Sequence, residues 1–224
     1  MGSPGGRSGR IGPAPIIAVA SAALLLTLLT LVRARWSPLL SFDRAAIVDL
    51  TDHTREHSAY QAGMTAVSQA MHSHWSVLYA VLIAAGLCLV KRVAEAGWLV
   101  FTVASGNLVN PLVKQLVDRR RPELAAPIES FSGLSFPAGH AASAMLICSA
   151  LLVLVWPSGN RGVRGIAVVV AIVIVLLSGG SRLVLGAHYP SDIVGGYLLG
   201  IAWVAACRPL LGWFRKRLLG VDRR

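Results

Sequence analysis

The chain has 224 residues, a mean hydropathy of +0.65 and a formal net charge of +11. Apolar residues make up 55% of it and charged residues only 14%, against about 25% charged in an average soluble domain. This much apolar surface cannot be buried in one domain of such length, which argues against a soluble enzyme, a disordered regulator and a small disulfide scaffold. The composition predicts an integral membrane protein, because cations that flank membrane spans explain the basic charge better than nucleic-acid binding does.

Breaking the sequence at its charged residues leaves six apolar segments, each close to the roughly 20 residues that a helix needs to cross a bilayer. They predict an all-α membrane protein with six transmembrane helices, at 15–32, 75–90, 96–113, 139–156, 165–181 and 190–207. The predicted organisation is a disordered tail at 1–14, a six-span membrane domain at 15–214 and a basic tail at 215–224. Gly179 and Gly180 are expected to end the fifth helix, and Gly195 and Gly196 to allow close packing of the sixth.

An even number of spans places both termini on one side of the membrane. Twelve of the 21 cations fall on that side with two acidic residues, whereas the other nine accompany eight acidic residues. The positive-inside rule therefore predicts cytoplasmic termini and three outward loops. The first outward loop, at about 33–74, is long and is expected to hold surface helices, one of them with Ser41 as its N-cap and another over 60–71.

Two cations mark the second outward loop. Lys114 ends the third predicted span, and Arg121 follows it seven residues later. On a continued helix this spacing places both side chains on the same face. Arg119 and Arg120 are interpreted instead as interfacial anchors, which is the usual role of cations at the end of a span.

Two histidines lie where predicted spans begin on the same side of the membrane. His140 stands in the first turn of the fourth span, after a tight turn at 136–139, and the free N–H groups of a helix N-terminus attract anions. His188 precedes the sixth span, with Arg182 before it and Asp192 after it. A carboxylate in that position can orient an imidazole and raise its basicity.

These groups together supply three fixed cations, two helix N-termini, two histidines and one aspartate. Cations and N–H groups bind phosphate and stabilise the charge of phosphoryl transfer. One imidazole can attack phosphorus while the other protonates the leaving oxygen. The sequence has no acidic cluster for a pair of metal ions, so the expected reaction uses no metal and no other cofactor.

Three ordered motifs carry this combination: Lys114-x6-Arg121-Pro122, Pro137-Ala138-Gly139-His140 and Ser181-Arg182-x5-His188-x3-Asp192. In order, spacing and loop placement they resemble the signature of the type 2 phosphatidic acid phosphatase family, which glucose-6-phosphatase and the vanadium haloperoxidases share. The resemblance implies an integral-membrane lipid phosphatase that acts through a phosphohistidine. His188 would be the nucleophile, Asp192 would orient it, and His140 would be the general acid.

The resemblance also implies a set of phosphate-binding groups: Lys114, Arg121, Arg182 and the backbone N–H of Gly139. Ala138 stands where the family usually has a serine whose hydroxyl contacts the phosphate. The missing hydroxyl predicts reduced or retuned activity, and Ser135 is a candidate replacement. His53, His57, His72 and His74, all in the first outward loop, are interpreted as solvated residues.

The expected partners are the bilayer and a lipid phosphate, either undecaprenyl diphosphate, phosphatidylglycerol phosphate or phosphatidic acid. The compact length and six spans favour a bacterial inner membrane, with the catalytic loops facing the periplasm. Two alternatives stay open. A membrane protein that binds phospholipid headgroups without turnover is supported only by Ala138, and a lipid-to-lipid phosphotransferase would use the same residues as the hydrolase.

Overall fold

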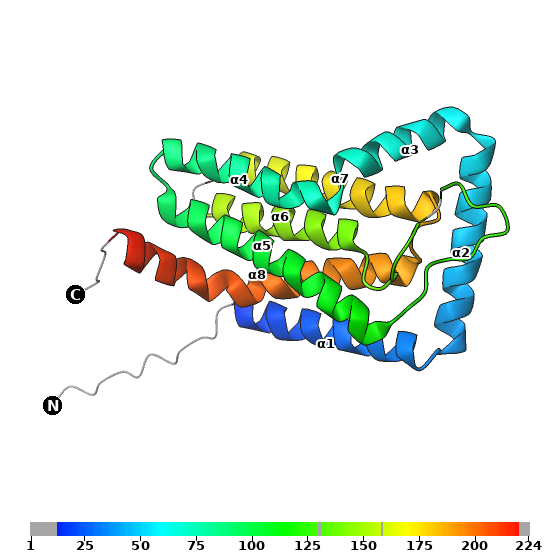
Figure 1. Cartoon of the computed structure of the whole chain (residues 1–224). Helices are drawn as coiled ribbons and strands as arrows, with labels where there is room; N and C mark the ends of the chain where they lie inside the picture. Colours follow the sequence, from blue (N-terminus) through cyan, green and yellow to red (C-terminus); the bar gives the residue numbers. More distant parts are fainter. Residues whose placement is uncertain (1–12, 130, 158, 220–224) are drawn as a thin grey trace.

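The computed structural model describes residues 13–129, 131–157 and 159–219, and these residues form eight α-helices (Figure 1). The helices are α1 (Pro13–Arg33), α2 (Ser37–Glu56), α3 (Ser58–Ala70), α4 (Ser73–Leu89), α5 (Val93–Val117), α6 (Gly139–Val155), α7 (Arg161–Val184) and α8 (Pro190–Leu219). The predicted all-α architecture is confirmed over this part of the chain.

A helix occupies each of the six predicted spans, but not every one is long enough alone to cross a membrane. The helices α1, α5, α7 and α8 pass on length and hydropathy. The helix α4 passes only together with α3, to which it is joined through a bend of 55°, and α6 is an apolar helix of 17 residues. The described residues therefore hold four or five candidate spans, and the count of six stays a prediction.

The helix α8 lies at the centre of the bundle, where it packs against α1, α5 and α6, while α4 packs on α5 and α7 on α6. The helix α2 lies across one end of the bundle (Figure 1). The start of α1 and the end of α8 lie at the opposite end. The α5–α6 and α7–α8 connections therefore both face α2, and they carry the predicted site residues.

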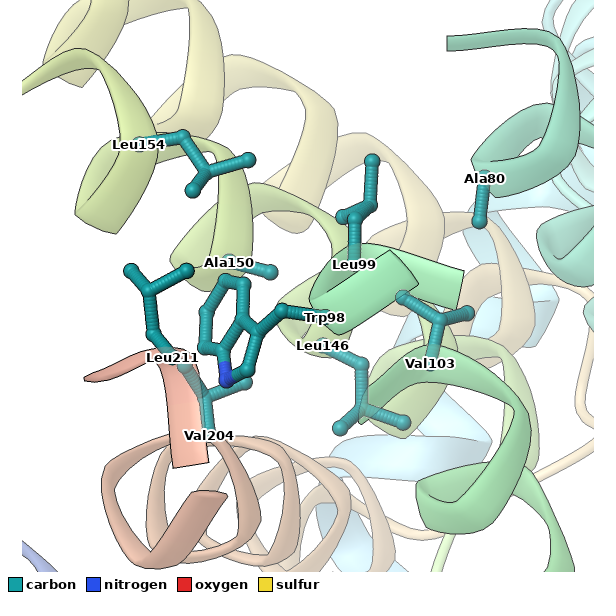
Figure 2. Close-up of a cluster of buried hydrophobic side chains, with 9 residues drawn as sticks. All are labelled: Ala80, Trp98, Leu99, Val103, Leu146, Ala150, Leu154, Val204 and Leu211. Atoms are coloured by element: carbon teal, nitrogen blue, oxygen red, sulfur yellow. The ribbon is translucent and has the colours of Figure 1, made fainter. Parts of the chain in front are cut away.

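A cluster of buried apolar side chains fixes the inner helices relative to one another away from the α2 end (Figure 2). Its members come from α4, α5, α6 and α8: Ala80, Trp98, Leu99, Val103, Leu146, Ala150, Leu154, Val204 and Leu211. Trp98 is fully buried, and its indole N–H donates to the Cys207 carbonyl at 2.8 Å. This bond satisfies the polar atom of a large buried ring, so the burial of its apolar surface stabilises the bundle without a desolvation penalty.

Two helices, α2 and α3, occupy the long loop between the first two predicted spans, as expected. Their position along the membrane surface stays a prediction. The prediction that Ser41 caps one of them is wrong. The helix α2 already begins at Ser37. Pro38 suits its first turn, because a proline has no N–H that the helix start would leave unpaired. The Ser41 hydroxyl lies inside the helix and donates to the Pro38 carbonyl at 3.0 Å. Of the two predicted tails, residues 1–12 and 220–224 lie outside the described residues.

The prediction that Gly179 and Gly180 end the fifth helix is also wrong, since α7 continues to Val184. Gly179 instead leaves room for Tyr197 of α8, where a Cβ atom would overlap the ring. The Tyr197 hydroxyl donates to the Val175 carbonyl at 2.7 Å. The glycine is therefore needed for the contact between α7 and α8 and not for a helix end.

Close packing by the glycines of α8 is confirmed. A Cβ atom on Gly195 would lie 2.6 Å from the Phe136 ring, and one on Gly196 would lie 2.6 Å from the Ala138 carbonyl oxygen. Any larger residue would push the chain segment before α6 away from α8. These two positions therefore bring the second motif against the third.

Candidate active site

The three motifs meet at the α2 end of the bundle. Each residue lies at a helix end or in a connection: Lys114 in the last turn of α5, Arg121 in the α5–α6 connection, His140 in the first turn of α6, Arg182 in the last turn of α7, His188 in the α7–α8 connection and Asp192 in the first turn of α8. Helix ends provide fixed backbone positions, so these side chains start from a rigid frame.

His188 and Asp192 are both buried, and they face each other with 3.6 Å between Nδ1 and Oδ2. The Ser135 hydroxyl donates to the same carboxylate oxygen and lies 3.3 Å from Nδ1 of His188. The Tyr189 N–H also donates to that oxygen, at 2.9 Å. The opposite ring nitrogen, Nε2, lies 3.4 Å from Nη1 of Arg121. One side of the imidazole is thus held in place while the other faces the cations.

The protonation state of His188 suits a nucleophile. Burial lowers its pKa to about 4, although the Asp192 carboxylate opposes the shift. The imidazole is therefore neutral near neutral pH. A neutral ring whose Nδ1 faces a carboxylate keeps a lone pair on Nε2, which is the electron pair that attack on phosphorus requires.

The three predicted phosphate-binding cations donate only to neutral acceptors: Lys114 to the carbonyls of Leu134 (2.7 Å) and Ser135 (3.2 Å), Arg121 to the carbonyl of Ala187 (2.9 Å), and Arg182 to the hydroxyl of Ser68 (2.6 Å). None of the three forms an ion pair with a carboxylate of the described residues. The site therefore carries positive charge without a matching anion, and this charge favours binding of a phosphate.

Phe131 was not predicted as a site residue, yet it contacts two of these cations. Its ring centroid lies 4.4 Å from the Arg182 guanidinium and 5.7 Å from that of Arg121. A ring face attracts cations at such distances. Phe131 therefore holds two like charges near each other without neutralising either of them.

His140 is also buried, and its Nε2 has no hydrogen-bond partner among the described residues. A buried polar atom without a partner is costly unless a ligand completes it, so this nitrogen is open to a hydrogen bond with a ligand. The His72 ring lies 4.8 Å away, edge-on, and stacks on His74. The interpretation of His72 as a solvated residue holds only in part, because the bend between α3 and α4 brings its half-buried ring against His140 of α6. His53, His57 and His74 are exposed as expected.

The second motif contributes through its backbone. Ala138 is fully buried, its methyl group packs with Ala141 and Ile193, and its N–H donates to the Asp192 carbonyl at 2.9 Å. Gly139 begins α6, and its N–H has no backbone acceptor in the described part of the chain. This N–H is therefore among the first-turn donors of α6 that are open to an anion. The Ser135 hydroxyl donates to the Asp192 carboxylate and so supports the histidine and carboxylate pair. That this hydroxyl replaces a phosphate contact stays a prediction.

The change Ala138→Ser tests this placement. Because the side chain faces an apolar cluster, we expect the added hydroxyl to change kcat/KM by less than about threefold and to lower the unfolding midpoint slightly. The measurement is phosphate release together with thermal unfolding in the same detergent. A rise in kcat/KM of tenfold or more would show that the hydroxyl reaches the phosphate.

The interpretation of Arg119 as an interfacial anchor is wrong. Its side chain is only 10% exposed. Nη1 lies 2.7 Å from both Oδ1 of Asp192 and Oγ of Ser191, and Nη2 lies 2.7 Å from Oδ2 of Asp43. The guanidinium also lies 4.2 Å from the Tyr189 ring centroid. Arg119 is therefore a buried bridge behind Asp192 and not an interfacial anchor.

Asp43 is the far end of this bridge, and it comes from α2. It is fully buried, and it accepts hydrogen bonds from the Ser191 hydroxyl and, at 3.0 Å, from the Ser191 N–H. One signal in the sequence points to it: Asp43 shares the buried face of α2 with Ile47 and Thr51, at intervals of four residues. An aspartate on the inner face of an amphipathic helix requires a partner.

The PAP2 superfamily profile matches residues 95–216, more than half of the chain and all three motifs. The chain therefore belongs to the PAP2 superfamily. It is an integral membrane lipid phosphatase of that superfamily with bacterial homologues, which confirms the class that the motifs predicted.

Three curated relatives illustrate the similarity. Phosphatidylglycerophosphatase B of Bacillus subtilis is 27% identical over 141 residues, 62% of this chain and 68% of the relative. Decaprenylphosphoryl-5-phosphoribose phosphatase of Mycobacterium tuberculosis H37Rv is 34% identical over 125 residues, 54% of this chain and 64% of the relative. Phosphatidylglycerophosphatase B of Escherichia coli K12 is 35% identical over 122 residues, 51% of this chain and 42% of the relative. The chain thus spans between about two fifths and two thirds of their lengths.

The fold has a solved counterpart. The crystal structure of a transmembrane PAP2 type phosphatidylglycerolphosphate phosphatase from Bacillus subtilis superposes with a TM-score of 0.77. The superposition covers 92% of this chain and 98% of that one at 22% identity. The chain therefore has the transmembrane PAP2 fold.

Proposed function

We propose that this protein hydrolyses the phosphate or diphosphate headgroup of a membrane lipid through a phosphohistidine on His188. The observation that carries the proposal is the placement of the buried, neutral imidazole between Asp192 on its Nδ1 side and Arg121 on its Nε2 side. A protein that only binds headgroups needs the cations, but it does not need a nucleophile with an orienting carboxylate.

In the first step, Nε2 of His188 attacks phosphorus and the bond to the leaving oxygen breaks. His140 donates the proton that this oxygen takes up. Lys114, Arg121 and the N–H of Gly139 stabilise the charge on the phosphoryl oxygens, together with Arg182. The Asp192 carboxylate stabilises the positive charge that forms on the imidazole.

In the second step, a water molecule attacks phosphorus and the P–N bond breaks. His140, now neutral, accepts the proton of that water, so that it regains its starting state. His188 leaves as a neutral imidazole, and inorganic phosphate is released. Both steps use the same side chains, and neither needs a metal ion.

The substrate class rests on the relatives and on the membrane fold. Two of the relatives named above are phosphatidylglycerophosphatases and one acts on a decaprenylphosphoryl lipid. The candidates for this chain are undecaprenyl diphosphate, phosphatidylglycerol phosphate and phosphatidic acid, all of which present a phosphate at the membrane surface.

The proposed orientation places both termini in the cytoplasm and the catalytic end in the periplasm of a bacterial inner membrane, with six spans. The charge distribution supports it, because twelve of the 21 cations lie in the terminal segments and in the connections on the same side. The arrangement of the helices agrees with it, because the α2 end lies opposite to the start of α1 and the end of α8 (Figure 1).

The test is phosphate release from the three candidate lipids in mixed micelles, with EDTA present and His188→Gln protein measured in parallel. We expect release that EDTA does not change and that the variant lacks. Consumption of the lipid phosphate without release of inorganic phosphate would favour the phosphotransferase. Tight lipid binding without any consumption would favour the headgroup-binding protein.

A further inference from the structure

A basic cavity lies beside the predicted catalytic residues. Its volume is about 1230 Å³, and it is enclosed by α2, by the ends of α1 and α5 that face α2, and by residues 117–126. Arg119 and Arg121 form part of its wall, whereas neither His140 nor His188 lines it. We call it the arginine cavity. It adjoins the active site through Arg121.

The arginine cavity carries a large positive charge. Seven of its lining residues are arginines and three are acidic, an excess of four positive charges. Arg55 pairs with Asp52, and Arg119 is neutralised by its own carboxylate partners. The side chains of Arg35 and Arg44 form no hydrogen bond or ion pair with any residue that the structure describes, and both are exposed. Guanidinium groups gathered in this way repel one another until an anion joins them.

Apolar side chains form another part of the lining. Val32 at the end of α1 and Val117 at the end of α5 contribute to the floor, and Leu40 of α2 to the wall. Both α1 and α5 are candidate spans, so their ends lie where lipid headgroups meet water. Cations backed by aliphatic side chains at this depth suit the charged group of a lipid.

We propose that the arginine cavity binds a second anionic group of the lipid substrate while the scissile phosphate lies against His188. Arg121 connects the cavity with the active site, because it lines the cavity and its Nη1 lies 3.4 Å from Nε2 of His188. The proposal rests on the proposed function and narrows it: the preferred substrates are lipids whose headgroups carry two phosphate groups, over lipids that carry one.

The first arm of the test uses lipids with identical acyl chains. Phosphatidylglycerol phosphate has two phosphate groups and phosphatidic acid has one. In the double variant Arg35→Gln/Arg44→Gln, we expect the ratio of their kcat/KM values to fall about tenfold, equivalent to about 1.4 kcal/mol. The matched control is Arg161→Gln/Arg217→Gln, which removes two exposed arginines at the opposite end of the bundle. The control should keep the ratio of the unchanged protein.

Two results of this arm overturn the proposal. An equal fall in kcat/KM for both lipids would mean that the arginines only attract anionic lipids to the surface. An unchanged ratio in the double variant would mean that the second phosphate lies elsewhere. Either result leaves phosphate release by the unchanged protein intact, so it is distinguishable from a failure of the proposed function, in which neither lipid is hydrolysed.

The second arm separates the lipid from a free anion and does not depend on turnover. The probes are methylphosphonate and methylenediphosphonate, and the readout is the thermal unfolding midpoint of the purified full chain in detergent. We expect the diphosphonate to raise the midpoint more than the monophosphonate does, and the double variant to lose this difference. A difference that the double variant keeps contradicts the cavity as the binding site. Loss of the difference with an unchanged lipid ratio would assign the cavity to a free anion and overturn the lipid proposal.

Discussion

Replacement of His188 by glutamine is expected to lower phosphate release by at least about 10⁴-fold, because no other group of the described site is placed to form the covalent intermediate. Removal of a nucleophile that acts together with its partner residues lowers the rate by this factor or more. The measurement is single-turnover phosphate release from a lipid phosphate. Thermal unfolding in the same detergent should show a cooperative transition, so that the loss reflects chemistry and not folding.

The variant His140→Gln is the companion to this experiment. We expect it to lower turnover of a lipid phosphate by about 10²–10⁴-fold, the usual contribution of a general acid. Its effect should be much smaller with p-nitrophenyl phosphate, whose leaving group needs no proton. Substantial release by His188→Gln, or equal losses for both substrates in His140→Gln, would contradict the assigned roles.

The second large effect is expected from Arg119→Gln. The change removes the cation between two buried carboxylates, Asp43 and Asp192, which lie on its two guanidinium nitrogens. Breaking a buried ion pair by removing one partner costs about 3–5 kcal/mol. Asp192 would also lose the contact that fixes it behind His188, and small displacements of catalytic groups lower rates by about 10²-fold. We therefore expect a lower unfolding midpoint and a lower kcat with little change in KM.

The neighbouring residue provides the control. Arg120 is exposed, so Arg120→Gln should leave the unfolding midpoint within the range of other surface changes. The double variant Asp43→Asn/Arg119→Gln should be more stable than the sum of the two single changes predicts, because it leaves fewer buried charges unpaired. Equal midpoints for Arg119→Gln and Arg120→Gln would show that the bridge contributes nothing to stability.

The amino-acid sequence predicted the elements that local patterns specify. Apolar segments between charges located six helices, and the order of the three motifs placed His188 beside Asp192 and both near Arg121. The predicted end of the fifth helix at Gly179 was wrong for a tertiary reason, since the glycine makes room for Tyr197 of α8. A glycine pair alone does not distinguish a helix end from a close contact between two helices.

The residues behind the site could not be predicted from spacing. Arg119 and Asp43 are 76 positions apart, and an arginine at the end of a span is usually an anchor. Only folding shows that α2 crosses the end of the bundle and points an aspartate inward. Ala138 is a different case, because the motif predicts a lost phosphate contact and the structure shows that the side chain packs against Ala141. The effect of the missing hydroxyl on activity stays a prediction.

The contact between α2 and the start of α8 decides which segments of the chain must be kept together when the protein is truncated or recombined. The superfamily profile begins at residue 95, but Asp43 and its hydrogen bonds to Ser191 tie an upstream helix to the start of α8. The segment that the profile matches is therefore shorter than the segment that supports the candidate active site. Chimeras that exchange the first four helices between relatives should work only when the aspartate and the arginine are exchanged as a pair.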